Sequence, residues 1–351
     1  MTNKKTLFIS LGTLVGSCLL FITIGSLVNA SQDKGPAFTG AYDVSVAEEL
    51  LVVTKEDEME TLSFLPNKEK SIPLFESEVG TSLFSPVFTE GNTATFIQTT
   101  GYEYGDDPDE VNSELAYSTI FSIDLSTNKV TILAKTRGIL LDLVYIPTTN
   151  QLLVAGENIN QQAEPQTTDR NETKLYHVNE GELEVIYEGS YAMPGSMQPT
   201  ADGQLMMILP DDQGNWNVDS MFESIERIYI ADPSESPLKL ELVSNPDKTE
   251  PISRFVQVDD GLIYQTIFNY HDSDDMFDYD LVPYSLDHEE EGDRLGISGH
   301  EIESLNAPKN QLLYYVKRTA TYRNGNDFTL HRHHLESGND VEIELHPQTE
   351  E

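Results

Sequence analysis

One phrase recurs along the chain: an apolar segment, a polar turn with Gly or Asn, and a second apolar segment. It reads SPVFTEGNTATFIQ, YIPTTNQLLVAG, QPTADGQLMMIL, VQVDDGLIYQTI and LNAPKNQLLYYV in turn, with a weaker copy before them. The turn residues of the units are Glu49, Gly91, Asn150, Gly203, Gly261 and Asn310, spaced 42, 59, 53, 58 and 49 residues apart. A unit of about 50 residues that recurs six times is typical of a repeat architecture. Gly and Asn suit tight hairpins, which need a positive φ.

Each unit has a second half that also has the pattern of a hairpin. TIFSIDLSTNKVTILA, KLYHVNEGELEVIYEG and FTLHRHHLESGNDVEIEL alternate apolar and polar residues on both sides of a polar turn. This alternation predicts β-strands, and two hairpins per unit give a four-stranded antiparallel sheet. We therefore predict an all-β fold, a six-bladed β-propeller over residues 41–346, with a short linker at 31–40 and a polar tail at 347–351. A two-sheet sandwich would not explain six similar units.

Two of the recurring segments, SPVFTEGN and MQPTADGQLMMI, resemble the TolB-type propeller repeat, in which the pattern Pro-x-aromatic-Ser-Pro-Asp-Gly precedes an apolar strand. KLYHV and RIYIAD are similar to the Leu-Tyr or Ile-Tyr element that opens the third strand of that repeat. The units at VQVDDG and LNAPKN lack its Ser-Pro element. The resemblance implies a propeller of a kind shared by binding proteins and by the non-catalytic parts of some peptidases. It identifies no specific member.

The N-terminus has the pattern of an export signal. Lys4 and Lys5 precede an uncharged run from residue 6 to residue 28, and the small residues VNA follow it. Residues 1–30 are therefore expected to form a cleaved signal peptide or, because the run is long enough to span a bilayer, a retained anchor helix. A third reading is lipidation at Cys18. In each case we expect an extracytoplasmic protein, membrane-anchored or secreted.

The charge of the chain limits its partners. Sixty acidic residues against 21 basic ones give a net charge of −39. Such a surface repels nucleic acid and anionic lipid, so contact with the membrane is expected only through the N-terminal segment. Cys18 is the only cysteine, so the rest of the chain has no disulfide, no thiolate metal site and no thiol nucleophile.

The connections between the second and third strands of five units are long, and all five fall on one face of the predicted propeller. Their candidate ligand- or partner-binding residues are Tyr102, Tyr104, Asp106, Asp107, Trp216, His271 and Tyr279. Loops on a rigid scaffold often carry function, and carboxylates among aromatics suit a protein, a basic peptide or a carbohydrate at the cell envelope. Asp272, Asp274 and Asp275 crowd together as weak candidates for Ca²⁺, without EF-hand spacing. Alternatively, the loops are acidic only because the whole chain is.

The innermost strands supply little for catalysis in this reading, because the residues expected there are Ser85, Gln198, Gln257 and Glu301. We therefore predict a non-enzymatic binding or scaffold propeller at the cell surface. The alternative is a propeller enzyme, a lyase or hydrolase, that acts in the central funnel. One further pattern, HRHH, places His331 and His333 on one face of a strand. With an added acid this pair could bind zinc, but it also fits a packed strand face.

Overall fold

The protein is described from a computed structural model. Of the 351 residues, it describes 35–66, 70–100, 116–157, 172–179, 181–190, 195–211, 224–259, 261–271, 277–297, 301–321 and 325–345. The helix predicted within residues 1–30 lies outside these ranges. No helix among the described residues is long and apolar enough to cross a membrane.

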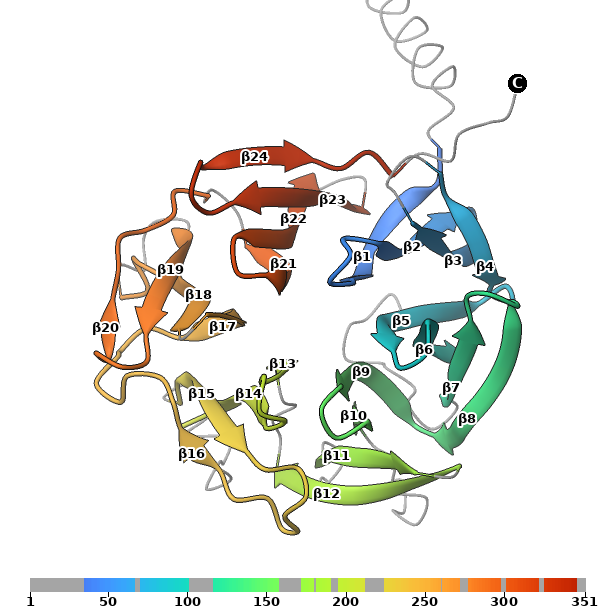
Figure 1. Ribbon diagram of the computed structural model, residues 1–351, viewed down its shortest axis with the longest axis horizontal. Helices are drawn as coiled ribbons and strands as arrows, with labels where there is room; N and C mark the ends of the chain where they lie inside the picture. Colours follow the sequence, from blue (N-terminus) through green and yellow to red (C-terminus); the bar gives the residue numbers. More distant parts are fainter. Residues whose placement is uncertain are drawn as a thin grey trace, which may run out of the picture. The chain divides into compact units, whose positions relative to one another are not determined.

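The described strands form six four-stranded antiparallel sheets arranged as blades around a common axis (Figure 1). Blade 1 consists of β1(Ala37–Val44), β2(Leu50–Glu56), β3(Met59–Leu65) and β4(Ile72–Glu76). Blade 2 consists of β5(Thr81–Thr89), β6(Thr93–Thr100), β7(Tyr117–Asp124) and β8(Lys129–Arg137). Blade 3 consists of β9(Ile139–Ile146), β10(Gln151–Glu157), β11(Glu172–Asn179) and β12(Glu182–Ser190). Blades 4 to 6 are β13(Gly195–Pro199), β14(Leu205–Pro210), β15(Glu226–Ala231) and β16(Glu241–Leu242); β17(Ile252–Val258), β18(Gly261–Ile267), β19(Tyr279–Ser285) and β20(Glu290–Glu291); and β21(Ile302–Lys309), β22(Leu312–Thr321), β23(Gly325–His334) and β24(Asn339–Glu342).

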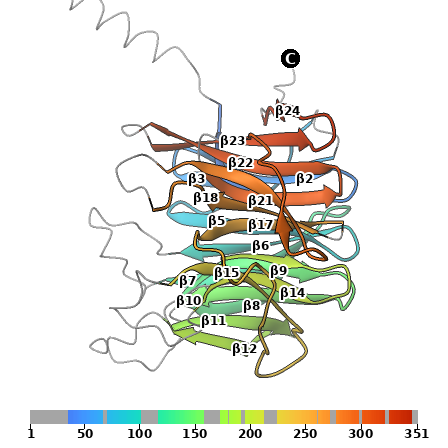
Figure 2. The ribbon, with the colours of Figure 1, turned by 90° about the vertical axis from the view of Figure 1, so that its left-hand side faces the viewer.

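The prediction of a six-bladed propeller is confirmed. Within every blade the strands follow one another from the axis outward, so each predicted pair of hairpins forms one sheet. Seen from the side, the strands run roughly along the axis, and the connections therefore lie at the two ends of the ring (Figure 2). Because neighbouring strands of a blade are antiparallel, its first and third strands end at one end of the ring and its second strand ends at the other.

The positive φ predicted for the turn residue is found in three of the units, lies at a different residue in the first and fifth, and is absent at Asn310. Gly91, Asn150 and Gly203 have φ values of 73°, 54° and 90°. In the first unit the left-handed residue is Glu48 (φ 64°), one position before the predicted one. In the fifth unit it is Asp259 (φ 46°), because the Gly predicted there already pairs with the end of β17 and belongs to the strand.

The hydrophobic core is divided among the interfaces between neighbouring blades. The described residues form six buried clusters, and each one combines side chains from two adjacent blades. The second strand of each blade contributes to both of its interfaces. In β2, for example, Leu50 and Val52 pack toward blade 6, whereas Leu51 and Val53 pack toward blade 2. This sharing explains the nearly continuous apolar sequence of these strands, which are covered on both faces.

The ring closes between blades 1 and 6 by side-chain packing, since each sheet consists of four consecutive strands. Apolar side chains of β1, β2, β22 and β23 form the cluster at this closing seam. The Tyr42 hydroxyl donates to the carbonyl of Tyr314 at 2.8 Å. Glu48 accepts from Lys309 Nζ at 2.7 Å and lies 3.5 Å from Arg332 Nη1. The contacts thus join the first hairpin of the chain to the last blade.

Candidate active site in the central channel

The inner strands of all six blades line a cavity of about 850 Å³, here called the central channel. Its wall extends to Ser45 and Val46 in the turn after β1, and to Pro147 after β9. These residues follow the carboxyl ends of inner strands. The channel therefore reaches the end of the ring where the first turns lie, opposite the end from which the long second connections leave.

Each inner strand is an edge strand, so one row of its backbone groups has no partner within the sheet. Each also pairs irregularly with its neighbour, with a register shift in every blade. Side chains in the channel bind the backbone groups freed in this way. Arg254 Nε donates to the carbonyl of Glu303 at 2.6 Å, and Gln198 Nε2 donates to the carbonyl of Leu305 at 3.4 Å. Arg254 thus joins the adjacent blades 5 and 6, whereas Gln198 reaches from blade 4 to blade 6.

Asp142 of β9 lies in the channel against Ser85 of β5. The Ser85 hydroxyl donates to Asp142 Oδ1 at 2.7 Å and accepts from the backbone N–H of Leu143 at 2.8 Å. Burial raises the pKa of Asp142 to about 6, although the Ser85 hydrogen bond and the charge of Arg254 oppose this rise. The carboxyl keeps some contact with the channel, so it is able to exchange a proton near neutral pH.

Asp43 of β1 is a second channel carboxyl of the same kind. Its Oδ2 accepts from the backbone N–H of Phe88 at 2.7 Å, and its Oδ1 accepts from Asn306 Nδ2 at 2.8 Å. Burial raises the pKa of Asp43 to about 6, against these hydrogen bonds. Two carboxyls from different blades therefore face one cavity, and both titrate where acid–base catalysis at near-neutral pH requires it.

Glu303 and Arg254 add charge to the same wall. The Glu303 carboxylate lies 3.9 Å from Arg254 Nη2 and forms an ion pair with Arg318. Arg254 also donates from Nη1 to the carbonyl of Ser253 at 2.6 Å. Since these bonds occupy its guanidinium, Arg254 serves to hold the wall and to bias the charge of Asp142.

The expectation that the inner strands offer little for catalysis is wrong. Ser85 and Gln198 do line the channel, but Gln257 and Glu301 are not among the described residues of its wall. Sequence reasoning missed the channel charges Asp43, Asp142, Arg254 and Glu303. A charged residue in the middle of an apolar strand was the available signal, as in AYDV, LLDLVYI and SRFVQV. Such a charge is rarely placed in a strand interior without a partner or a function.

The predicted loop residues are described only in part. Tyr102, Tyr104, Asp106, Asp107 and Trp216, together with the calcium candidates Asp272, Asp274 and Asp275, lie outside the described residues. His271 is exposed beside the ring of Tyr270, with 5.3 Å between the ring centroids. Tyr279 begins β19 and is half-buried, and burial raises its pKa. Neither is part of the described channel wall, so the binding role of this loop face stays a prediction.

His331 and His333 of HRHH point to a shared acid. His331 Nδ1 lies 3.3 Å from Asp340 Oδ2, and His333 Nδ1 lies 3.6 Å from Asp340 Oδ1. Each ring thus approaches a different oxygen of one carboxylate. Across the described part of the chain, no group of three or more His, Cys, Asp or Glu side chains is arranged to hold a metal ion. The packed strand face is the better description, and burial lowers the pKa of His333.

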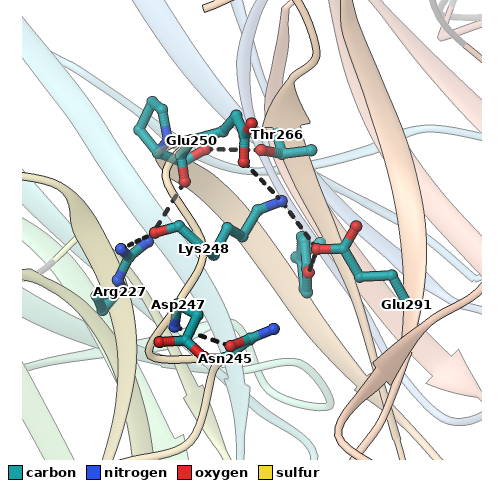
Figure 3. A network of polar contacts seen from close by, with 9 residues as sticks. Arg227, Asn245, Asp247, Lys248, Glu250, Thr266 and Glu291 are labelled. Carbon is teal, nitrogen blue, oxygen red and sulfur yellow. Dashed lines mark hydrogen bonds and ion pairs between the residues drawn. The ribbon is translucent and has the colours of Figure 1, made fainter.

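A second polar cluster lies between blades 4 and 5, beside a hollow of about 470 Å³ (Figure 3). Lys248 is buried, with its Nζ 2.8 Å from Glu291 Oε1 and 3.6 Å from Glu250 Oε2. The Tyr264 hydroxyl also donates to Glu291, and Arg227 donates to the carbonyls of Lys248 and Glu250. Because the cations here are paired with anions and carbonyls, the cluster fastens two blades together.

The comparisons with known proteins agree with this fold. No protein-family model matches the sequence, and no curated protein matches it. An oligogalacturonate lyase in complex with manganese aligns with 88% of this chain and 76% of its own, at 13% identity and a TM-score of 0.53. The oligogalacturonate lyase of Vibrio parahaemolyticus aligns with 88% of this chain and 78% of its own, at 13% identity and a TM-score of 0.51.

A third similar structure is the acylaminoacyl peptidase of Pyrococcus horikoshii. It aligns with 88% of this chain but 45% of its own, at 12% identity and a TM-score of 0.56. At such identities the likeness establishes the fold, and it supports the resemblance to TolB-type propellers at that level. The printed names of these structures are those of enzymes, but at these identities only the fold carries over to this chain. The prediction of a non-enzymatic binding or scaffold propeller depended on an inner wall without charged groups. Four charged side chains line the channel, so that prediction is wrong and the enzyme alternative is the better one.

Proposed function

We propose that this protein is an exported propeller enzyme whose active site is the central channel, where Asp43 and Asp142 act as an acid–base pair. The observation that carries the proposal is that both carboxyls face one cavity and have pKa values raised to about 6. Near that pH one carboxyl can hold a proton to donate while the other accepts one. Hydrolysis and elimination both use an acid and a base, so the pair suits either reaction, and the charge of the molecule is what favours a hydrolase over a lyase that acts on an anionic polymer.

The charge of the molecule limits the classes of substrate that the channel can bind. With a net charge of −39 and acidic groups in the channel, the protein repels polyanions and attracts cations. We therefore propose an uncharged or cationic substrate, which includes neutral sugars and amine-bearing peptides. An anionic polymer such as oligogalacturonate, which the similar lyases are named for, fits this charge poorly.

The test is an activity screen with neutral chromogenic glycosides, amino-acid arylamides and a polygalacturonate control, from about pH 4.5 to about pH 8. We expect hydrolysis of a neutral or amine-bearing probe with a maximum near pH 6, where the two carboxyls titrate. Asp142→Asn and Asp43→Asn should each lower kcat by about 10²- to 10⁴-fold, since each removes a proton-transfer group.

The control is Asp57→Asn, which changes an exposed carboxylate in the turn after β2 to the same amide. Its left-handed backbone (φ 54°) suits Asn, so the fold should tolerate the change. Full activity of both channel variants, or an equal loss in the control, would refute the assignment of the active site.

A further inference from the structure

Ser85 has an unusual backbone for its place in a strand. Its φ is 44°, in the left-handed region, and it lies inside the register shift between Phe84 and Val87 of β5. Two other residues are left-handed inside the register shifts of inner strands: Gly40 of β1, with φ 91°, and Ser196 of β13, with φ 45°. A residue other than Gly in this conformation is strained, and such strain often accompanies function.

The hydroxyl explains why a serine is useful where a glycine would be unstrained. Ser85 Oγ donates to Asp142 Oδ1 at 2.7 Å and accepts from the N–H of Leu143 at 2.8 Å. Both contacts cross from blade 2 to β9 of blade 3. Ser196 offers a comparison, since its hydroxyl has the same backbone setting but donates to the carbonyl of Phe255 at 3.5 Å. The left-handed turn of Ser85 thus aims a hydroxyl at the carboxyl of a neighbouring blade.

We propose that Ser85 is a positioning residue for Asp142, which holds the carboxyl in one orientation through a hydrogen bond to Oδ1. This inference deepens the proposed function and rests on the role of Asp142 in the channel. The Leu143 N–H occupies an acceptor site of the Ser85 oxygen. The hydroxyl proton then has two acceptors within reach, and Asp142 Oδ1 at 2.7 Å is much nearer than the carbonyl of Leu143 at 3.4 Å, so the proton is directed to Asp142. A hydrogen bond of this kind stabilises the ionised carboxylate and opposes the effect of burial on its pKa.

The test is a titration of Asp142 by NMR in the full chain with ¹³C-labelled aspartate carboxyls, assigned with Asp142→Asn. Ser85→Gly and Ser85→Ala both remove the hydroxyl, but only Gly also relieves the backbone strain. We expect the pKa of Asp142 to rise by roughly one unit in both variants, the usual size for a hydrogen bond to a charged group. Ser77→Ala, the control, removes a buried hydroxyl that accepts from the N–H of Glu60 at 2.9 Å outside the described channel wall, and should leave that pKa unchanged.

The outcomes separate this inference from the proposed function. A Ser85→Gly protein that melts differently but has an unchanged Asp142 pKa would show a merely structural serine and overturn the inference. If Asp142→Asn abolishes hydrolysis while the Ser85 variants leave the pKa unmoved, only the positioning role fails. If the pKa moves but Asp142→Asn keeps full activity, the proposed active site fails instead. Should Ser85→Ala not fold, Ser85→Gly still decides the question, because Gly adopts this backbone freely.

Discussion

At the scale of single residues, the channel carboxyls act on stability as well as on chemistry. The folded-state pKa of Asp142, about 6, is above its usual value of 3.8. Between these two values the folded protein binds more protons at this site than the unfolded chain does. The group therefore favours folding most below pH 3.8, and this contribution is lost as the pH rises through 6.

The corresponding prediction concerns Asp142→Asn. An amide does not ionise, so the variant avoids the cost of a buried carboxylate at high pH. We expect its melting temperature, relative to that of the wild type, to be higher at about pH 8 than at about pH 4. Circular dichroism melts at the two pH values measure this difference. Asp57→Asn should show no such change, and an equal difference at both pH values for Asp142→Asn would contradict the raised pKa.

The channel residues also show where sequence reasoning ended. The alternation of apolar and polar residues assigns each side chain to one face of a sheet or the other, but it does not say which side chains of the inner strands reach the central channel. The register shifts of the inner strands change this alternation, and in β17 the residue that lines the channel is Arg254, next to such a shift, and not Gln257. A bulge of this kind leaves no period in the sequence. The long connections were visible in the sequence, and their length drew attention to the opposite end of the ring.

At the scale of elements, the strands were predictable because turn chemistry and strand alternation agree in most units. The outermost strands were harder, since β16 and β20 have two residues each and leave little pattern. Side-chain contacts fix the short strand β20 to the rest of the sheet and to the segment that follows blade 4. Glu291, half of that strand, binds Lys248 and the Tyr264 hydroxyl. Although burial works against ionisation of Glu250, Lys248 holds the pKa of Glu250 below its usual value.

This arrangement predicts the effect of removing the buried lysine. Lys248→Met keeps the volume of the side chain but removes the cation that Glu250 and Glu291 share. We expect a loss of about 1–3 kcal/mol in the free energy of unfolding at neutral pH, less than for a fully buried pair because both partners are about one-third exposed. The loss should shrink at about pH 4, since the part due to Glu250 is lost as the pH falls through the lowered pKa of that carboxyl.

Urea denaturation at the two pH values provides the measurement. Lys239→Met is the matched control, because Lys239 forms an exposed ion pair with Glu235 at 3.1 Å. Its effect should stay within about 0.5 kcal/mol. An equally small effect of Lys248→Met would show that the cluster in Figure 3 does not fasten the blades.

At the scale of the whole molecule, the net charge of −39 acts against the compact state. Like charges brought together on folding repel, and salt screens them over a distance of about 10 Å at 0.1 M. We expect the melting temperature to rise when NaCl increases from about 0.02 M to about 0.2 M. A fall over this range would mean that the attractive ion pairs, such as those at Glu48 and Lys248, outweigh the repulsion.

The way the ring closes determines the order in which it can be completed. A chain made from its N-terminus produces blade 1 first, yet the side chains of β1 and β2 that face blade 6 have no cover until β22 and β23 exist. Each intermediate between these points is an open arc with two uncovered apolar ends. The final blade thus covers the apolar face of the first blade. A chain that stops before β23 would leave the apolar side chains of β1 and β2 exposed, where they could bind another copy of the chain and aggregate.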